Sequence, residues 1–263
     1  MSVDNILLCA QVAEQAAYAA GTHLLASRSR LPAVLLTHRN PAVELAAIEA
    51  EAEDLIRDVV NRQFPEHGLR GNATPPQLRD GRPLWVVDAL DGRANYERGY
   101  PQYAVSIALV VDGEPVVGVV YDPCRNEFFG AIRGHGAVLN GQRIRCAAPR
   151  SLLDALAATV FPKPPSPRMS PYMAELGRVL RAFGGVRRSG SMALEMAYLA
   201  AGRVDAFWKH DMSSWDAAAG VLLLRESGAI VEARDAEPVL LSRSLLACTP
   251  GLRGSFIDLL SPA

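Results

Sequence analysis

Residues 85–96 read WVVDALDGRANY, an apolar run that ends in two aspartates, Asp88 and Asp91, followed by a glycine. The apolar residues 84–87 predict a short buried strand, so that Asp88 emerges at its end and Asp91 follows one turn later. Both carboxylates can then face one pocket, where two like charges repel unless a cation or a proton lies between them. A hard cation such as Mg²⁺ takes carboxylate and phosphate oxygens as ligands. The stretch therefore predicts a cation site, although Asp and Gly after a strand are also the ordinary residues of a turn.

The length and composition of the chain set the outer limits on its fold. Its 263 residues are 49% hydrophobic and carry a formal net charge of −1, which allows a large core in one big domain or two ordinary ones. This near-neutral charge implies neither a nucleic-acid polymer nor an anionic membrane as a partner. Residues 5–26 have helical spacing without a basic leader, which favours a core-packed helix over a signal peptide. No run approaches the roughly 18 apolar residues of a membrane span.

The four cysteines indicate neither a zinc site nor a disulfide framework. Cys9, Cys124, Cys146 and Cys248 lie far apart, and the sequence contains no C-x-x-C pair. A reducing compartment is the simplest setting for such a chain, so we expect a cytoplasmic protein.

The rest of the chain alternates between helical and strand patterns, without an internal repeat. Asp112-Gly113 between two apolar runs predicts the turn of a β-hairpin. The proline-rich segment 161–171 breaks the pattern and marks a boundary or a surface loop. We therefore expect two halves, residues 1–150 and residues 151–263, each carrying one acidic motif.

The second acidic motif is SSWDAAAGVLLLRESGA, at residues 213–229. Asp216 follows Trp215 and opens a predicted helix that begins Ala-Ala-Ala-Gly, small residues that let a backbone approach closely. A role as N-cap would by itself account for Asp216. A third carboxylate at a helix N-terminus is also well placed to complete a metal cluster, while the helix dipole favours a phosphate nearby.

Five segments, taken in order, resemble the inositol monophosphatase family of Mg²⁺-dependent phosphatases. They cover nearly the whole chain and are residues 85–96, 103–123, 134–144, 189–208 and 215–229. The resemblance implies an α/β layered sandwich, αβαβα, with mixed and largely antiparallel sheets, as in inositol monophosphatase and fructose-1,6-bisphosphatase. It also implies a homodimer with a lithium-sensitive metal cluster at the junction of the two halves. Mg²⁺ is the implied cofactor, with Mn²⁺ as an alternative.

The family's metal-binding motifs, D-P-I-D-G-T-x-N-F and W-D-x-x-A-G, correspond to residues 88–96 and 215–220 of this chain. By position, the resemblance implies a set of metal ligands made of Asp88, the backbone carbonyl of Leu90, Asp91 and Asp216. The backbone N–H groups of Gly92 and Arg93 would then face the substrate phosphate.

Two further places in the sequence bear on the substrate. Gly190 and Ser191 match the family's G-S/T-A loop that lines the pocket, although Gly-Ser before a helix is also an ordinary cap. Lys209 lies seven residues before Asp216, where inositol-selective members carry a Glu that binds sugar hydroxyls. A lone Lys in a loop is otherwise usually solvated.

Three departures from the family pattern concern the activation of water. Where the family has G-E-E, with the first Glu on the metal, this chain has Asn72 and Ala73, and the Asn72 amide can bind Mg²⁺ without adding charge. Arg93 replaces a Thr that helps to activate water, and a guanidinium cannot act as a base. The nearest counterpart of the family's upstream aspartate is Glu49, in a helix with many acids. The three aspartates of the family's metal cluster are thus present in this sequence. The residues that help to activate water in the family are replaced.

Three functional hypotheses follow. The first is a Mg²⁺-dependent phosphomonoesterase for a small phosphorylated metabolite, in which Glu49 and the three aspartates are catalytic, because metal ions can activate water and neutralise the phosphoryl group. The second is a family member that has lost catalysis and acts as a binding or regulatory protein, with Arg93 paired to Asp88 or Asp91 in place of a cation. The third is a phosphatase shifted toward sugar bisphosphates or nucleotide 3′-phosphates, which the positive charge of Lys209 favours.

Overall fold

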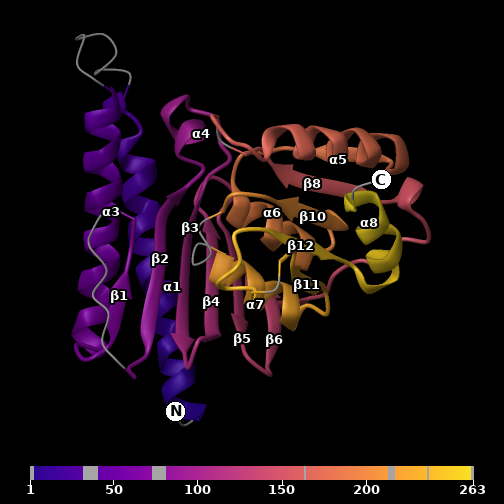
Figure 1. The fold of residues 1–263 in the computed structure, drawn as a ribbon. Helices are drawn as coiled ribbons and strands as arrows, with labels where there is room; N and C mark the ends of the chain where they lie inside the picture. The colour runs from indigo at the N-terminus through magenta and orange to yellow at the C-terminus, as the bar shows by residue number, and fades with distance from the viewer. Residues whose placement is uncertain are drawn as a thin grey trace.

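Two β-sheets organise the chain, and layers of helices enclose them (Figure 1). The structure is a computed structural model that describes residues 3–31, 41–72, 81–162, 164–212, 217–235 and 237–261. Among the helices in these ranges, none has both the length and the apolar character needed to cross a membrane.

The larger sheet has the strand order β1-β2-β3-β4-β5-β6-β7. Its strands are β1 (Gly68–Arg70), β2 (Leu84–Asp91), β3 (Ala104–Val111), β4 (Glu114–Asp122), β5 (Glu127–Ile132), β6 (Gly136–Leu139) and β7 (Gln142–Ile144). Strands β1 and β2 pair in parallel, and the remaining neighbours pair antiparallel. Strands β3 and β4 are joined by Asp112 and Gly113, whose φ angles of 53° and 78° are those that a tight hairpin turn requires. The predicted hairpin is therefore confirmed.

The smaller sheet is mixed and has the strand order β11-β12-β10-β8-β9. Its strands are β8 (Leu156–Val160), β9 (Gly185–Arg187), β10 (Ala206–Lys209), β11 (Ile230–Ala233) and β12 (Leu245–Cys248). Strand β8 pairs in parallel with β9 and β10, whereas β12 pairs antiparallel with β10 and β11. All five strands follow residue 150, but the division of the chain into halves at that residue stays a prediction.

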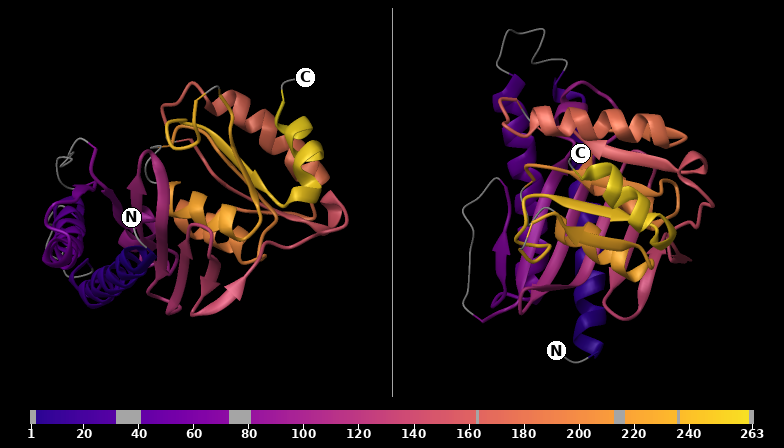
Figure 2. Two further views of the ribbon diagram at one scale, coloured as in Figure 1. Left: turned by 90° about the horizontal axis from the view of Figure 1, so that it is seen from below. Right: turned by 45° about the vertical axis from the view of Figure 1, so that its right-hand side comes forward.

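The helices form three layers around the two sheets, as the views in Figure 2 show. Helices α1 (Val3–Ser27) and α3 (Pro41–Gln63) cover one face of the larger sheet. Helices α6 (Met192–Ala200) and α7 (Ala218–Glu226) fill the space between the sheets. Helices α5 (Met169–Ala182) and α8 (Arg253–Leu260) cover the outer face of the smaller sheet. The order is αβαβα, so the predicted fold class is confirmed.

Three short elements complete the fold within the described ranges. They are the helix α4 (Arg93–Glu97) and the 3₁₀ turns Leu152–Asp154 and Pro250–Leu252. Helix α4 begins directly after β2 and turns the chain at one end of the larger sheet, which becomes important for the site below.

Side chains of the larger sheet alternate between two cores. Trp85 and Ile107 pack toward α1 and α3, whereas their neighbours Val86 and Ala108 pack toward α6 and α7. All four are at most 5% exposed. The sheet is thus buried on both faces, which explains why its strands read as nearly continuous apolar runs.

Helix α7 lies unusually close to the larger sheet. A Cβ atom added to Gly118, in β4, would lie 3.0 Å from the backbone oxygen of Ala219 in α7. A Cβ atom added to Gly220 would lie 2.7 Å from the sulfur of Met196 in α6. The small residues at the start of α7 therefore allow the close backbone approach expected from the sequence, and the element that α7 approaches is β4.

Candidate active site

A β-bulge in β2 brings Asp88 and Asp91 to the same side of the strand. In the pairing of β2 with β3, Asp88 lies opposite Ser106 and Asp91 lies opposite Ala104. Two residues of β2 thus oppose the single residue Val105. On a regular strand, residues three apart point to opposite faces, and the one extra residue of the bulge restores a common side. Both carboxylates accordingly line one cavity.

Gly92 turns the chain from β2 into α4. Its φ of 92° and ψ of 31° lie in the left-handed region, which glycine adopts without strain. A Cβ atom at this position would lie 2.8 Å from the carbonyl oxygen of Gln102. Any other residue would therefore be strained as well as crowded here, and the direction in which α4 leaves Asp91 depends on this glycine.

Asp91 is held in place by the start of α6. Its Oδ2 accepts hydrogen bonds from the Ser191 hydroxyl at 2.6 Å and from the Ala193 N–H at 2.7 Å. Ser191 is fully buried and also caps α6, since its hydroxyl oxygen accepts from the Leu194 N–H at 3.3 Å. Burial raises the pKa of Asp91, while the bonds from Ser191 and Ala193 and the charge of Lys209 oppose this shift. Ser191 therefore orients Asp91 in addition to capping a helix.

Asn95, to which the sequence analysis gave no role, joins α4 to the loop before α6. Its Nδ2 donates to the carbonyl oxygens of Gln102 and Ser189, both at 2.7 Å. Gly190, with a φ of 93°, makes room for this amide, because a Cβ atom there would lie 2.9 Å from Asn95 Nδ2. The signal for Asn95 was present in the D-G-x-x-N spacing of residues 91–95.

Arg93 forms an ion pair with Glu49 of α3. Its Nη1 lies 2.8 Å from Glu49 Oε2, and the two side chains are 47% and 10% exposed. The second hypothesis placed Arg93 against Asp88 or Asp91, and that part was wrong. The arginine is the first residue of α4, and its side chain reaches the α3 wall of the cavity that it shares with Asp88 and Asp91. A permanent positive charge thus lies against the acid that the resemblance assigned to catalysis.

These elements enclose a cavity of about 590 Å³ at the junction of the two sheets. Its lining includes nine of the residues expected from the sequence: Glu49, Asn72, Asp88, Leu90, Asp91, Gly92, Arg93, Gly190 and Lys209. Lys209 was expected in a loop, but it is the last residue of β10, whose end opens into the cavity. Ala73 and Asp216 lie outside the described residues. The individual roles of all these residues stay predictions.

Six further residues line the cavity, and the sequence analysis gave none of them a role: Ala94, Glu97, Val160, Phe161, Arg188 and Met192. Arg188 lies in the loop between β9 and α6, and Phe161 directly follows β8. Arg188 and Lys209 place positive charge on the wall formed by the smaller sheet, facing Asp88 and Asp91 on the wall formed by the larger sheet. A phosphate group in the cavity would therefore meet cationic side chains as well as the acids.

The donor chemistry of the cavity fits a hard cation. Within the described ranges, no group of three or more His, Cys, Asp or Glu side chains is arranged to hold a metal. Asp88, Asp91 and Leu90 all line this cavity, and the two carboxylates and the Leu90 carbonyl are the kind of oxygen ligand that Mg²⁺ takes. The raised pKa of Asp91 reflects a buried negative charge that a cation would stabilise.

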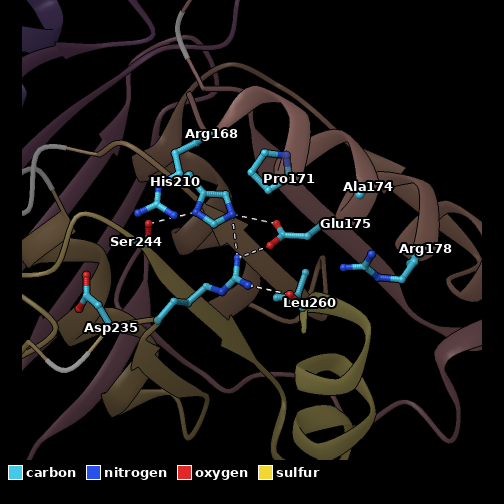
Figure 3. Close-up of a pocket in the computed structure, with 10 residues that line it drawn as sticks. Arg168, Pro171, Ala174, Glu175, Arg178, His210, Asp235, Ser244 and Leu260 are labelled. Atoms are coloured by element: carbon cyan, nitrogen blue, oxygen red, sulfur yellow. Dashed lines mark hydrogen bonds and ion pairs between the residues drawn. The ribbon is translucent and has the colours of Figure 1, made fainter. Parts of the chain in front are cut away.

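A second cavity, of about 410 Å³, lies beside α5 and the end of α8 (Figure 3). There Glu175 lies 2.8 Å from both His210 Nε2 and Arg234 Nη1. Arg178 and Arg234 donate to the last carbonyl oxygens of α8, those of Leu259 and Leu260, at 2.6 and 2.8 Å. These groups satisfy helix-end carbonyls that would otherwise lack partners, so the cluster docks α8 onto the smaller sheet.

The chain is thus a layered α/β sandwich with a cavity at the junction of its two sheets, and carboxylates line that cavity. The chain belongs to the inositol monophosphatase family, whose sequence model matches residues 8–260. The inositol-1-monophosphatase of Rhizobium meliloti is 38% identical over 215 residues, which cover 81% of this chain and 81% of that protein. The Nus factor SuhB of Escherichia coli K12 is 39% identical over 222 residues, which cover 84% of this chain and 83% of that protein.

Solved structures share the fold across the full length. Inositol monophosphatase from Anabaena superposes with a TM-score of 0.86 at 32% identity, covering 97% of this chain and 96% of that one. The extragenic suppressor protein suhB from Bartonella henselae superposes with a TM-score of 0.87 at 33% identity, covering 96% and 98%. The family predicted from the sequence is therefore confirmed.

Proposed function

We propose that this chain is a Mg²⁺-dependent phosphomonoesterase that acts on a small phosphorylated metabolite. The observation that carries the proposal is the bulge in β2, which turns Asp88 and Asp91 into one cavity. Two carboxylates in one cavity repel each other, and a cation between them relieves that repulsion. The volume of about 590 Å³ suits a small-molecule ligand. The similarity to an inositol-1-monophosphatase supports the same activity.

The roles of the protein groups follow from their positions. Asp88, Asp91 and the carbonyl of Leu90 would hold the cation, with Mn²⁺ as an alternative to Mg²⁺ and Asp216 as a further ligand inferred from the resemblance. The cation supplies charge neutralisation to the phosphate and lowers the pKa of water. Ser191 and the Ala193 N–H fix the orientation of Asp91, so that the carboxylate needs little rearrangement when it binds.

The cationic side chains of the cavity would guide the substrate. The positive charge of Lys209 is close enough to Asp91 to oppose the rise in its pKa. The same charge would attract a phosphate that enters the cavity. The substrates that this charge favours are sugar bisphosphates or nucleotide 3′-phosphates over neutral polyol monophosphates. A homodimer in the cytoplasm, expected from the resemblance and from the cysteine pattern, remains part of the proposal.

A second candidate function is a binding or regulatory role with weakened catalysis. The ion pair of Arg93 with Glu49 favours this candidate. Glu49 would otherwise help a cation to activate water, and in the ion pair its carboxylate contacts a guanidinium instead. Several relatives bear the name Nus factor SuhB, which suggests a role in transcription for those proteins. Under this candidate, a macromolecular partner of the transcription machinery replaces the metabolite as the principal ligand.

Phosphate release by the purified protein, with Mg²⁺ or with EDTA, separates the two candidates. The first predicts metal-dependent release from a phosphomonoester. The second predicts little or no release even with Mg²⁺, together with retained folding.

A further inference from the structure

A groove runs between α1 and the strands of the larger sheet that extend past this helix (Figure 1). Leu7, Gln11, Glu14 and Tyr18 line it from α1, and residues of β4, β5 and β6 form its floor. These α1 residues span positions 7–18, which is about 16 Å of helix. Two cavities, of about 340 and 780 Å³, share Gln11 and Glu14 and together form what we call the α1 groove. It therefore has room for an elongated small molecule.

The end of the α1 groove near Leu7 is apolar. Val119 and Ile132 line it, and Gly130 leaves a hollow between them in the floor of the groove. A Cβ atom added to Gly130 would lie 3.5 Å from a methyl group of Val138, which is ordinary van der Waals distance. The hollow can thus take a further carbon atom without displacing the protein. An alkyl or aryl group that enters it leaves water, which is favourable.

Three aromatic side chains gather at the other end of the α1 groove. The ring of Tyr121 contacts those of Tyr18 and Phe128, with centroids 5.8 and 6.0 Å apart. Gly21 makes room for this cluster, because a Cβ atom there would lie 2.5 Å from Tyr121 Cε1. The Tyr121 hydroxyl donates to Asn126 Oδ1 at 3.0 Å, which fixes the ring. Tyr18 is 58% exposed, so its ring is open to a ligand.

The α1 groove differs in charge from three other cavities in the described part of the chain. Each of those cavities includes at least two Arg or Lys side chains, whereas the α1 groove has none. Of its lining residues, only His135 at the apolar end could become positive. Within the described ranges, no hydrogen bond or ion pair engages the Glu14 side chain. Because a carboxylate and the faces of aromatic rings attract cations, a positively charged group is the complement of this groove.

We propose that the α1 groove binds a small organic cation with an apolar tail. The ammonium group lies beside the Glu14 carboxylate and the exposed ring of Tyr18, and the tail fills the hollow at Gly130. Burial of the tail supplies most of the affinity, and the charge supplies the specificity. Among the described residues, none lines both the α1 groove and the active-site cavity. The proposal is therefore independent of the phosphatase function.

Calorimetric titration of hexyltrimethylammonium into the purified chain tests the proposal. We expect saturable binding of one cation per chain, with a Kd below about 1 mM. Tetramethylammonium has the head without the tail, and hexanoate reverses the charge of the head. Each should bind at least about tenfold more weakly than hexyltrimethylammonium. The absence of saturable binding would overturn the proposal, and so would hexanoate binding as tight as that of hexyltrimethylammonium.

Three variants locate the site. Tyr18→Ala removes the exposed ring, Glu14→Gln removes the charge at nearly constant size, and Gly130→Ala fills the hollow. Each should weaken the binding of hexyltrimethylammonium about 3- to 10-fold. Tyr100→Ala is the matched control, because Tyr100 is 57% exposed and does not line the groove, and it should change the affinity by less than about twofold. If all four variants bind hexyltrimethylammonium equally well, the cation binds elsewhere and the site is refuted.

Discussion

Arg93 Nη1 lies 2.8 Å from Glu49 Oε2. Arg93 directly follows the D-x-x-D-G motif, Glu49 belongs to α3, and both residues line the active-site cavity. A guanidinium carries a permanent positive charge. A second cation would therefore meet a fixed positive charge on this side of the site. The geometry favours metal binding at Asp88 and Asp91 over metal binding at Glu49.

The double variant Asn72→Glu with Arg93→Thr should bind Mg²⁺ more tightly and release phosphate faster. It removes the guanidinium from beside Glu49, adds a carboxylate at position 72 and places a hydroxyl at position 93. Removing a like charge several Å from a cation is worth on the order of a few kcal/mol, which corresponds to about a hundredfold in affinity. Calorimetric Mg²⁺ titration and a phosphate-release assay check this. Weaker metal binding with slower hydrolysis in the double variant would instead show that Arg93 contributes to catalysis in the wild-type protein.

Ser191→Ala should weaken both metal binding and folding. The alanine removes the 2.6 Å donor to Asp91, and loss of such a partner typically lowers metal affinity about 10- to 100-fold. It also removes the cap of α6, which costs about 1 kcal/mol. Ser191→Thr retains the hydroxyl and serves as the control. Equal Mg²⁺ affinities for the wild type, Ser191→Ala and Ser191→Thr would contradict an orienting role for Ser191.

The stability of the protein should fall in acid as Glu175 is protonated. Burial would raise the pKa of Glu175, but its hydrogen bond with His210 and the charge of Arg234 outweigh burial and hold the pKa below its usual range. A carboxyl whose folded pKa is depressed adds stability above its unfolded pKa of about 4.3 and loses it as the pH falls through the folded pKa.

Glu175→Gln should therefore destabilise the protein at pH 7 by about 3 kcal/mol or more and flatten the acid part of the stability curve. Glu114→Gln, which removes a largely exposed ion pair with Arg225, should cost less than about 1 kcal/mol. Denaturant unfolding between about pH 2 and pH 7 measures both effects. An unchanged pH profile in Glu175→Gln would contradict the structural role given to the Glu175 cluster.

Gly118→Ala should destabilise the fold, since its Cβ atom would lie 3.0 Å from the Ala219 oxygen. Overpacking of this kind costs about 1 to 3 kcal/mol, because α7 must move away from β4. Gly130→Ala is the matched control in the neighbouring strand β5, where the nearest atom lies at 3.5 Å. It should change the free energy of unfolding by less than about 0.5 kcal/mol. Equal denaturation midpoints for the two variants would show that α7 is not held close to β4.

Local features of the fold could be predicted because they depend on nearby residues. Asp112-Gly113 specifies a tight turn through backbone conformation alone. The small residues that begin α7 indicate that its backbone packs closely against another element, which is β4. The partner of Arg93 could not be predicted in this way. Glu49 lies 44 residues earlier on another element, and the choice between Glu49 and the aspartates depends on how α4 leaves the sheet.

The same limit applies to residues that lie far apart in the sequence and meet only in the fold. Ser191 was predicted as a cap or a pocket residue, but its bond to Asp91 spans 100 residues of sequence. Arg187 and Arg188 are adjacent and chemically identical, so that only the packing of β9 and the following loop decides which one faces the cavity. Sequence spacing identifies acids that can bind metal, whereas tertiary packing determines what orients and neutralises them.

The central claim is that Asp88 and Asp91 hold a catalytic cation, and phosphate release by the purified protein tests it most directly. The assay uses a generic phosphomonoester with Mg²⁺ or with EDTA, for the wild type, Asp91→Asn and the control Asp112→Asn, which alters an acid in the β3–β4 turn. We predict release with Mg²⁺ only, reduced at least about a hundredfold in Asp91→Asn and unchanged in Asp112→Asn. Activity that survives both EDTA and Asp91→Asn would contradict the account.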